Sequence, residues 1–417
     1  MSVEHFHTDI VILGAGIGGF ETFRTLNKLL KSRGIKKTIT LVDQNDYFTF
    51  TPLLHEVAAG IVEPGHAALP LREIVSETPH RFINTTVTKV FPDQKIIITD
   101  RGEMSYDYCV AGIGSGVNYY GIPGADQFSY NVRTLTEAMR LQEELVRKLE
   151  SGDRTIDVVV VGGGFSGVEV AGLMAHLANH DLQKLYPEAR ISVSLIQNDA
   201  ALVPLLPRRA QELVTKRLEK MKVKIFLKSA VKEVAARAIA MADSSAIPST
   251  MTIWCAGVKN VGENIFDSSF CEKGRLPVTE YLNCAKAPSL YGVGDIISGK
   301  NIGSTFLFPQ LGEAAHRQGE YIASHIVATL RKKSIRPFYF KSKGILMPIG
   351  ERYGVAVMGP FVFGGLIAWW LRRTAYVLFM PGLLLKLKIV FDWTLRLLGF
   401  KDIMYVATSN KQGTKNK

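Results

Sequence analysis

Two apolar runs, each followed directly by a glycine-rich loop, predict an α/β fold with two Rossmann-like dinucleotide-binding domains. The first run, 10–13, leads into Gly14-Ala-Gly-Ile-Gly-Gly19, and the second, 158–161, leads into Gly162-Gly-Gly-Phe-Ser-Gly167. Both loops fit G-x-G-x-x-G and stand between a strand-like and a helix-like run. The first glycine permits a tight turn, the second lets the backbone approach a pyrophosphate, and the third packs the helix on the strand. One such loop is a weak signal, but two predict two nucleotides between which electrons pass.

Residues 1–120 are expected to form the first part of the first domain. The run 38–42 predicts its second strand, which ends in Asp43. An acid at this place, about twenty residues past the glycines, can accept a hydrogen bond from the ribose of an adenosine. Further strands are predicted over 96–98 and 106–110, and the small residues 111–115 then let the backbone approach a cofactor.

Residues 121–284 are expected to form the second domain. Its second strand, 191–196, is followed by Gln197 instead of an acid. A carboxylate there would repel the 2′-phosphate of NADPH, whereas a neutral amide can donate to a hydroxyl or to a phosphate. Asp199, two residues on, retains some bias against phosphate. The sequence therefore predicts a relaxed nicotinamide specificity, with NADPH accepted as well as NADH.

The segment 285–330 is expected to return to the first domain. It contains an apolar strand that ends in Gly294-Asp295. In a protein with two nucleotide sites, an acid at this position meets the ribityl and phosphate end of a flavin.

The remaining residues, 331–417, hold much of the net charge of +12, with sixteen Lys and Arg against three acids. Apolar runs with tryptophan, phenylalanine and leucine alternate with these basic residues, and none reaches the roughly 18–20 residues that span a bilayer. This pattern predicts amphipathic helices that lie in the membrane interface. A buried hairpin or a homodimer interface is the alternative. Nucleic-acid binding is excluded because no recognition module is legible.

The four cysteines show neither C-x-x-C nor zinc spacing, which favours reduced, mostly buried thiols and no metal site. Residues 1–7 are short and polar, so no signal peptide is expected. Together with the basic C-terminal region, this predicts a peripheral membrane protein on the cytoplasmic face.

Over nearly its whole length the chain resembles the type II NADH:quinone oxidoreductases, within the flavoproteins that have two dinucleotide-binding domains. The resemblance is carried by both glycine loops and by further motifs: Asp43–Tyr47, Thr51–Leu54, Ala111–Ser115, Trp254–Gly257 and Gly294-Asp295. It implies FAD, a hydride from NADH or NADPH, and transfer of two electrons to a membrane quinone in a respiratory chain without proton pumping. Sulfide:quinone relatives use a redox cysteine pair, and no pair is obviously placed for that here.

The resemblance also implies the site residues. Glu169 would lie near the nicotinamide and the flavin, where it could orient the carboxamide or assist protons; alternatively it only complements a helix dipole. FAD would be held by Gly14, Ala15, Gly16, Gly19, Asp43, Gln44 and Asp295, with backbone contact near Gly114. The nicotinamide dinucleotide would be held by Gly162, Gly164, Ser166, Gly167 and Gln197.

The acceptor side departs from the family pattern. Where the family has Ala-Gln-x-Ala-x-Gln on a helix beside the flavin, this chain has Gly-Glu-Ala-Ala-His-Arg over 312–317. Glu313 and Arg317 therefore replace two glutamines, one helical turn apart. They form either an altered quinone pocket or a helix-surface salt bridge, and His316 beside them is expected to be structural.

Two other functions remain open. The chain could be an NAD(P)H-binding flavoprotein with a redox-sensing or interaction role, which slow reoxidation by quinone would indicate. It could also be a quinone reductase of the same superfamily that uses another donor, although the intact second loop argues against that.

Overall fold

The computed structural model describes residues 3–398 of the 417-residue chain and divides them into two compact units. Unit 1 comprises the chain up to Pro52, Ala68–Asn118 and Val258–Lys343. Unit 2 comprises Leu53–Ala67, Tyr119–Gly257 and the chain from Gly344. The segment 53–67, placed by the sequence in the first domain, thus groups with unit 2, as does the described part of the C-terminal region.

Unit 1 is built on a sheet in the order β5-β2-β1-β8-β7-β6, and β20 also pairs with β8, at Cys109–Ala111, on the edge that β8 shares with β7. Strands β5, β2, β1, β8 and β20 run parallel, while β6 and β7 form an antiparallel hairpin. The apolar run 10–13 ends β1 and is fully buried. The bounds are β1 Val3–Leu13, β2 Ile39–Asp43, β5 Arg81–Asn84, β6 Val87–Phe91, β7 Ile96–Thr99, β8 Gly102–Ala111 and β20 Leu290–Gly292.

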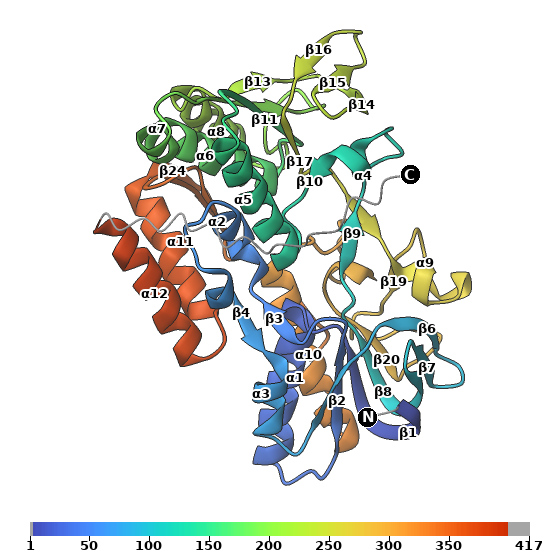
Figure 1. The fold of residues 1–417 in the computed structure, drawn as a ribbon. Coiled ribbons are helices and arrows are strands. Elements are labelled where there is room, and N and C mark those ends of the chain that lie inside the picture. Colours follow the sequence, from blue (N-terminus) through green and yellow to red (C-terminus); the bar gives the residue numbers. More distant parts are fainter. Residues whose placement is uncertain (1–2, 399–417) are drawn as a thin grey trace, which may run out of the picture. The chain divides into compact units, whose positions relative to one another are not determined.

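Two helices of unit 1, α1 (Ile17–Ser32) and α10 (Gly312–Leu330), pack side by side (Figure 1). Small residues bring their backbones together, because a Cβ at Gly319 would lie 2.6 Å from the carbonyl oxygen of Gly18. Smaller elements complete the unit. They are β3 Tyr47–Thr49, β4 Ala68–Pro70, α3 Leu71–Ser76, β9 Ser115–Val117, β18 Val258–Asn260, α9 Gly262–Ile265, β19 Leu276–Pro277 and β21 Ile297–Ser298.

Unit 2 is built on a parallel sheet in the order β10-β17-β11-β12-β13. The run 158–161 ends β11 and is buried, as predicted for a strand covered on both faces. The strands are β10 Ser129–Tyr130, β11 Thr155–Val161, β12 Arg190–Ile196, β13 Lys224–Phe226 and β17 Met251–Trp254. The main helices are α2 Leu54–Ala58, α5 Leu135–Glu150, α6 Phe165–His176 and α8 Arg208–Lys220. A separate antiparallel sheet joins β14 Val231–Val234, β15 Ala238–Met241 and β16 Ala246–Pro248.

The C-terminal part of unit 2 begins with an antiparallel sheet of β22 (Ile345–Pro348), β23 (Gly354–Met358) and β24 (Phe361–Gly365). Helices α11 (Leu366–Phe379) and α12 (Leu383–Leu397) follow, coloured orange to red in Figure 1. The first part of the expected amphipathic segment is therefore a strand. It ends at Gly365, whose φ of +117° a side chain would strain.

Residues 399–417, the end of the expected membrane-association region, lie outside the described residues. Within 3–398, none of the helices combines the length and the apolar character needed to span a bilayer.

Close packing at Gly19 generates a stability prediction. A Cβ there would lie 1.8 Å from the carbonyl oxygen of Gly14. Because this is a backbone atom, it cannot move away without a large cost in free energy. Gly19→Ala should therefore lower the free energy of unfolding by about 3 kcal/mol or more. Gly16→Ala is the matched control, because a Cβ at Gly16 meets nothing within 4 Å. Thermal unfolding of the cofactor-free chain measures both, and equal effects would contradict the packing argument.

Candidate functional site

The first glycine-rich loop forms the turn between β1 and α1. Gly14 has a φ of +89°, and a Cβ there would lie 2.4 Å from the carbonyl oxygen of Gly112. Gly16 caps α1 with extended backbone, and the space beside it is open. The first turn of a helix leaves its N–H groups without intrahelical partners, and these favour an anion. The loop thus has the shape and polarity for a phosphate group.

Asp43, the last residue of β2, is tied to this loop. Its Oδ2 accepts a hydrogen bond from the backbone N–H of Ala15 at 2.6 Å, and its Oδ1 accepts one from that of Asn45 at 2.8 Å. Burial raises the pKa of the Asp43 carboxyl group. The next residue, Gln44, is exposed. Asp43 is therefore fixed beside the phosphate loop, and Gln44 faces solvent at the turn.

Asp295 lies in a short turn after β20, Gly294–Ile296, and Ser115 Oγ donates to its Oδ2 at 2.6 Å. The turn is held by Gln318 on α10, whose Oε1 accepts a hydrogen bond from the N–H of Gly294 at 2.8 Å. Gln318 is 1% exposed. The sequence analysis did not predict this role of Gln318, because its partner lies 24 residues away along the chain. Nearby in the chain, Gly114 has a φ of +69° and open space at its Cβ position.

The second loop repeats the first. Gly162 has a φ of +105°, and a Cβ there would lie 2.7 Å from the backbone nitrogen of Ala256. Gly164 caps α6 in extended backbone with open space beside it, and a Cβ at Gly167 would lie 1.7 Å from the carbonyl oxygen of Gly162. Ser166 is exposed in the first turn of α6. The same three glycine roles therefore occur in both units.

Gln197 takes the place in unit 2 that Asp43 has in unit 1. Its Oε1 accepts a hydrogen bond from the N–H of Gly163 at 2.8 Å, just as Asp43 accepts from the second loop residue. Its Nε2 donates to Oδ2 of Asp199 at 2.7 Å. Gln197 is buried, while Asp199 is exposed. The amide therefore holds a carboxylate at the end of β12, although it is not itself an acid.

Glu169, in the second turn of α6, belongs to a cluster of charged groups inside unit 2. His55 and Glu56 on α2 and Arg372 on α11 complete it. Arg372 Nη1 donates to Glu56 Oε1 at 2.6 Å, and Arg372 Nη2 lies 3.0 Å from His55 Nε2. His55 Nδ1 lies 3.6 Å from Glu169 Oε2. The sequence singled out Glu169 alone, because its partners stand more than a hundred residues away from it along the chain.

The electrostatics of the cluster separate its two carboxyl groups. Burial raises the pKa of Glu169 to about 7, with Arg372 opposing this rise and Glu56 adding to it. Burial would also raise the pKa of Glu56, but Arg372, His55 and Arg373 together lower it to about 2. Burial and then Arg372 lower the pKa of His55 to about 3. Near neutral pH, Glu56 is therefore an anion, His55 is neutral, and Glu169 is poised to bind or release a proton.

Helix α12 completes the surroundings of Glu56. Trp393 Nε1 donates to Glu56 Oε2 at 2.8 Å, so both carboxylate oxygens are hydrogen-bonded. Arg373 is buried between two indole rings, with its Cζ 3.8 Å from the ring centroid of Trp369 and 4.5 Å from that of Trp393. These contacts stabilise the cation by its attraction to the aromatic faces.

A second ionic group fixes the end of α12. Arg396 Nη2 donates to Asp181 Oδ2 at 2.6 Å, and its Nε donates to Glu351. Asp392 Oδ2 lies 2.8 Å from Nδ1 of His66. Burial would raise the pKa of Glu351, but His176 and Arg396 lower it to about 2.

These contacts correct one expectation for the C-terminal helices. Amphipathic helices would separate the basic residues from the apolar ones and leave them accessible, yet Arg372, Arg373 and Arg396 are all buried. Their partners come from distant segments, which the local pattern of apolar and basic residues does not reveal. The exposed side of α11 and α12 is apolar instead. It includes Leu366, Ile367, Trp370, Leu371, Leu378, Leu383, Leu384, Leu387, Val390, Phe391 and Leu397.

Glu313 and Arg317 pair on α10, with Glu313 Oε1 3.6 Å from Arg317 Nε. Glu313 is also held from outside the helix, because its Oε2 accepts from Ser342 Oγ at 3.0 Å and its Oε1 from the N–H of Lys343 at 3.1 Å. The pair thus joins the start of α10 to the last residues of unit 1. These contacts hold Glu313 in place and leave Arg317 partly exposed.

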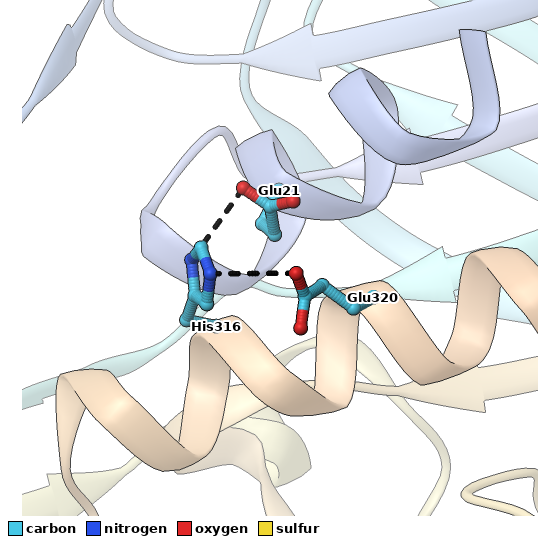
Figure 2. Close-up of side chains that lie close together, drawn as sticks. All are labelled: Glu21, His316 and Glu320. Atoms are coloured by element: carbon cyan, nitrogen blue, oxygen red, sulfur yellow. Dashed lines mark ion pairs between the residues drawn. The ribbon is translucent and has the colours of Figure 1, made fainter. Parts of the chain in front are cut away.

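Figure 2 shows His316 between two carboxylates. Its Nδ1 lies 3.4 Å from Oε2 of Glu21 on α1, and its Nε2 lies 3.7 Å from Oε1 of Glu320, one turn further along α10. Arg24 also donates two hydrogen bonds to Glu21, at 3.0 and 2.8 Å. His316 therefore joins α1 to α10 through Glu21.

All four cysteines are free. Cys109 and Cys284 are buried, while Cys255 and Cys271 are partly so. Burial, with Glu169 adding to it, raises the pKa of Cys255 to about 12, so its thiol stays protonated and unreactive.

Comparison with known proteins gives a consistent result. The model of a family described as pyridine nucleotide-disulphide oxidoreductase matches residues 8–319. A type II NADH:quinone oxidoreductase of Mycobacterium tuberculosis is 26% identical over 418 residues, covering 93% of this chain and 88% of that protein. A demethylphylloquinone reductase of Synechocystis is 25% identical over 407 residues, covering 94% and 96%.

The structure of NDH2 from Plasmodium falciparum in complex with NADH matches with a TM-score of 0.85 at 19% identity, over 95% of this chain and 99% of that chain. The predicted α/β fold with dinucleotide-binding domains is thereby confirmed.

The hydrogen bond from Trp393 to Glu56 generates a prediction. Trp393→Phe should lower the free energy of unfolding by about 1–3 kcal/mol, because a buried carboxylate oxygen loses its donor. Trp370→Phe makes the same change on α11 at a side chain that is 49% exposed, and it should have little effect. Urea unfolding followed by circular dichroism compares the two. Equal, small losses would show that the hydrogen bond contributes nothing.

Proposed function

The chain belongs to the pyridine nucleotide-disulphide oxidoreductase family, and from this premise we propose that it is an FAD-dependent NADH:quinone oxidoreductase. The pair of glycine loops carries the proposal, because each unit has a loop open for a pyrophosphate and a polar side chain fixed beside it. The names of the mycobacterial and cyanobacterial relatives support NADH as donor and a quinone as acceptor.

FAD is assigned to unit 1. The open space beside Gly16 accepts a pyrophosphate, and Asp43 faces the place of the adenosine ribose. Asp295, held by Ser115, faces the ribityl end, with backbone contact at Gly114. Bound FAD would supply the redox chemistry, accepting a hydride from a dihydronicotinamide and passing two electrons to a quinone.

NADH is assigned to unit 2, at the loop from Gly162 to Gly167. The geometry of Gln197 favours NADH over NADPH. Its oxygen is engaged by Gly163 and one of its two amide hydrogens by Asp199, so only one amide hydrogen is left that could donate to a 2′-phosphate. The carboxylate of Asp199 would repel that phosphate and accept from a ribose hydroxyl. Acceptance of NADPH beside NADH remains a prediction from the sequence.

Glu169 is proposed as the group that exchanges a proton during turnover. Its pKa of about 7 matches this task, because a general acid or base works best near the operating pH. Its surroundings, His55, Glu56 and Arg372, are fixed by hydrogen bonds within unit 2.

On the acceptor side we assign Glu313 and Arg317 a modest role. Arg317 is 33% exposed and could contact a quinone headgroup, whereas Glu313 is engaged by Ser342 and Lys343. Arg317→Gln is therefore expected to change the KM for quinone more than that for NADH. Equal changes in both would indicate general damage.

The exposed apolar side of α11 and α12 is proposed to lie on a bilayer, with the partly buried Lys386 and Lys388 reaching the headgroups. Truncation would be a poor test, since it strips Glu56 of Arg372 and Trp393. Leu384→Glu on α12 leaves those contacts intact and should reduce binding to vesicles of anionic phospholipid about tenfold or more, because burying one leucine contributes about 1.5–3 kcal/mol. Vesicle flotation measures this. Leu205→Glu, at a residue 89% exposed, is the control, and equal retention by all three proteins would contradict the proposal.

The proposed function is tested by stopped-flow spectroscopy of the FAD-loaded protein in mild detergent. Mixing with NADH should bleach the flavin rapidly, and adding a short-chain quinone should restore the yellow colour rapidly. Rapid bleaching without return would favour a redox-sensing role or another acceptor. No bleaching would overturn the assignment of the donor.

The assignment of FAD to unit 1 has its own test. The variant Gly16→Val should be purified without FAD.

Nicotinamide choice gives a further prediction. Asp199→Asn should raise kcat/KM for NADPH relative to NADH about tenfold, corresponding to about 1.4 kcal/mol of removed repulsion. Asp243→Asn, at an exposed carboxylate of the same unit that bonds Ser245, is the control. A wild-type preference for NADH of roughly 100-fold or more would contradict relaxed specificity, and an unchanged ratio in Asp199→Asn would remove Asp199 from the argument.

A further inference from the structure

The contact between Arg372 and His55 determines which ring nitrogen of His55 carries a proton. A guanidinium group has only donors, so Nε2 of His55, 3.0 Å from Arg372 Nη2, must accept the hydrogen bond. Nε2 is therefore unprotonated. The hydrogen-bond network thus assigns the proton of a neutral His55 to Nδ1.

That proton points toward Glu169. Nδ1 of His55 lies 3.6 Å from Glu169 Oε2, slightly beyond hydrogen-bond distance, so a small movement of either side chain would form the bond. His55 and Glu169 are 5% and 16% exposed at their side chains, which leaves little room for water to screen them. The N–H of His55 is thus directed at the carboxyl group whose proton the proposed reaction uses.

The other charges around His55 leave it neutral. The charge of Glu56 on α2 is neutralised by Arg372 at 2.6 Å. Glu56 therefore does little to stabilise a protonated His55. On α11, Tyr376 lies under the guanidinium of Arg372, with its ring centroid 4.3 Å from Cζ, and burial raises the pKa of Tyr376. Buried Arg373 adds a second positive charge to this helix.

Helix α5 also packs on α2, and most of its charged residues pair with one another. Glu144 binds Arg147 at 2.7 Å, and Glu137 lies 3.9 Å from Arg140. On α12, Trp393 contributes a neutral donor to Glu56. The charged neighbours of His55 are therefore the groups of the buried cluster, and they form a connected network.

We propose that His55 is a positioning residue for Glu169, held by Arg372 of α11 as the neutral tautomer with its proton on Nδ1. This proposal rests on the proposed role of Glu169 in proton exchange. The two residues have different roles. Glu169 binds and releases a proton, whereas His55 keeps its own proton and orients the carboxyl group of Glu169. Helix α11 thereby acts on the site through His55.

The first test observes His55 directly. Long-range ¹H–¹⁵N NMR spectra of the full chain labelled with ¹⁵N-histidine distinguish the two tautomers, and His55→Asn identifies the signal. A signal of the Nδ1–H tautomer that does not change between about pH 5 and 8 is expected. An Nε2–H signal, or a titration within this range, would overturn the proposal. In Arg372→Met the Nε2–H tautomer should appear.

The second test observes Glu169. Infrared difference spectra against pH follow its carboxyl C=O band, identified by its loss in Glu169→Gln. His55→Leu removes the donor and should raise the pKa of Glu169 above its value of about 7, because the carboxylate loses a nearby N–H. His55→Asn retains an N–H close to the position of Nδ1 and should restore the wild-type curve.

A control and the possible outcomes complete the test. His325→Leu changes a half-buried histidine of unit 1 and should leave the Glu169 band unaltered. Equal shifts in His55→Leu and His55→Asn, or none in either, would overturn the positioning role. Neither test needs turnover, so a failure of NADH oxidation in the stopped-flow experiment is recognised separately.

Discussion

The ion pair between Arg372 and Glu56 is the interaction on which the interior of unit 2 depends. Both side chains are at most 5% exposed, so removing them from water is expensive. Such a pair is tolerated only when its remaining donors and acceptors are engaged, and here Trp393 takes the second oxygen of Glu56 while His55 accepts from Arg372. The C-terminal helices therefore cannot be regarded as an appendage, since they supply the groups that make a carboxylate on α2 stable inside the protein.

The two units solve one problem in nearly the same way. In each unit a glycine-rich loop connects a strand to a helix. One of its glycines has a positive φ, one leaves open space for a ligand, and one packs against the backbone of the loop. Each unit then braces the loop from the end of the next strand. In unit 1 the carboxylate of Asp43 accepts the hydrogen bond from the loop. In unit 2 the neutral amide oxygen of Gln197 accepts it, and the amide nitrogen of Gln197 donates to Asp199. The same architecture thus presents two different electrostatic environments to two nucleotides.

Features of the fold could be predicted from the sequence where they depend on residues that are close together along the chain. The strands that precede the loops follow from their apolar runs, and the glycine roles follow from spacing. The turn at Asp295 was likewise indicated by Gly-Asp after an apolar strand. Partners remote in sequence could not be predicted: Arg372 meets Glu56 across 316 positions, and nothing in either neighbourhood encodes the other. For the same reason the buried arginines of α11 and α12 resembled ordinary interfacial cations, and the contact of Gln318 with Gly294 could not be predicted.

The position of Trp393 and Arg396 near the end of the described chain has a consequence for biosynthesis. Domains generally fold as units while the ribosome works from the N-terminus. The last strand of the unit 1 sheet, β20, and helix α10 are complete by Leu330, so unit 1 can close while translation continues. Unit 2 cannot, because Glu56 lacks Arg372 and Trp393, and Asp181 lacks Arg396, until α11 and α12 have emerged from the ribosome. The interior of unit 2 is therefore completed only after helix α12 has been synthesised, later than that of unit 1.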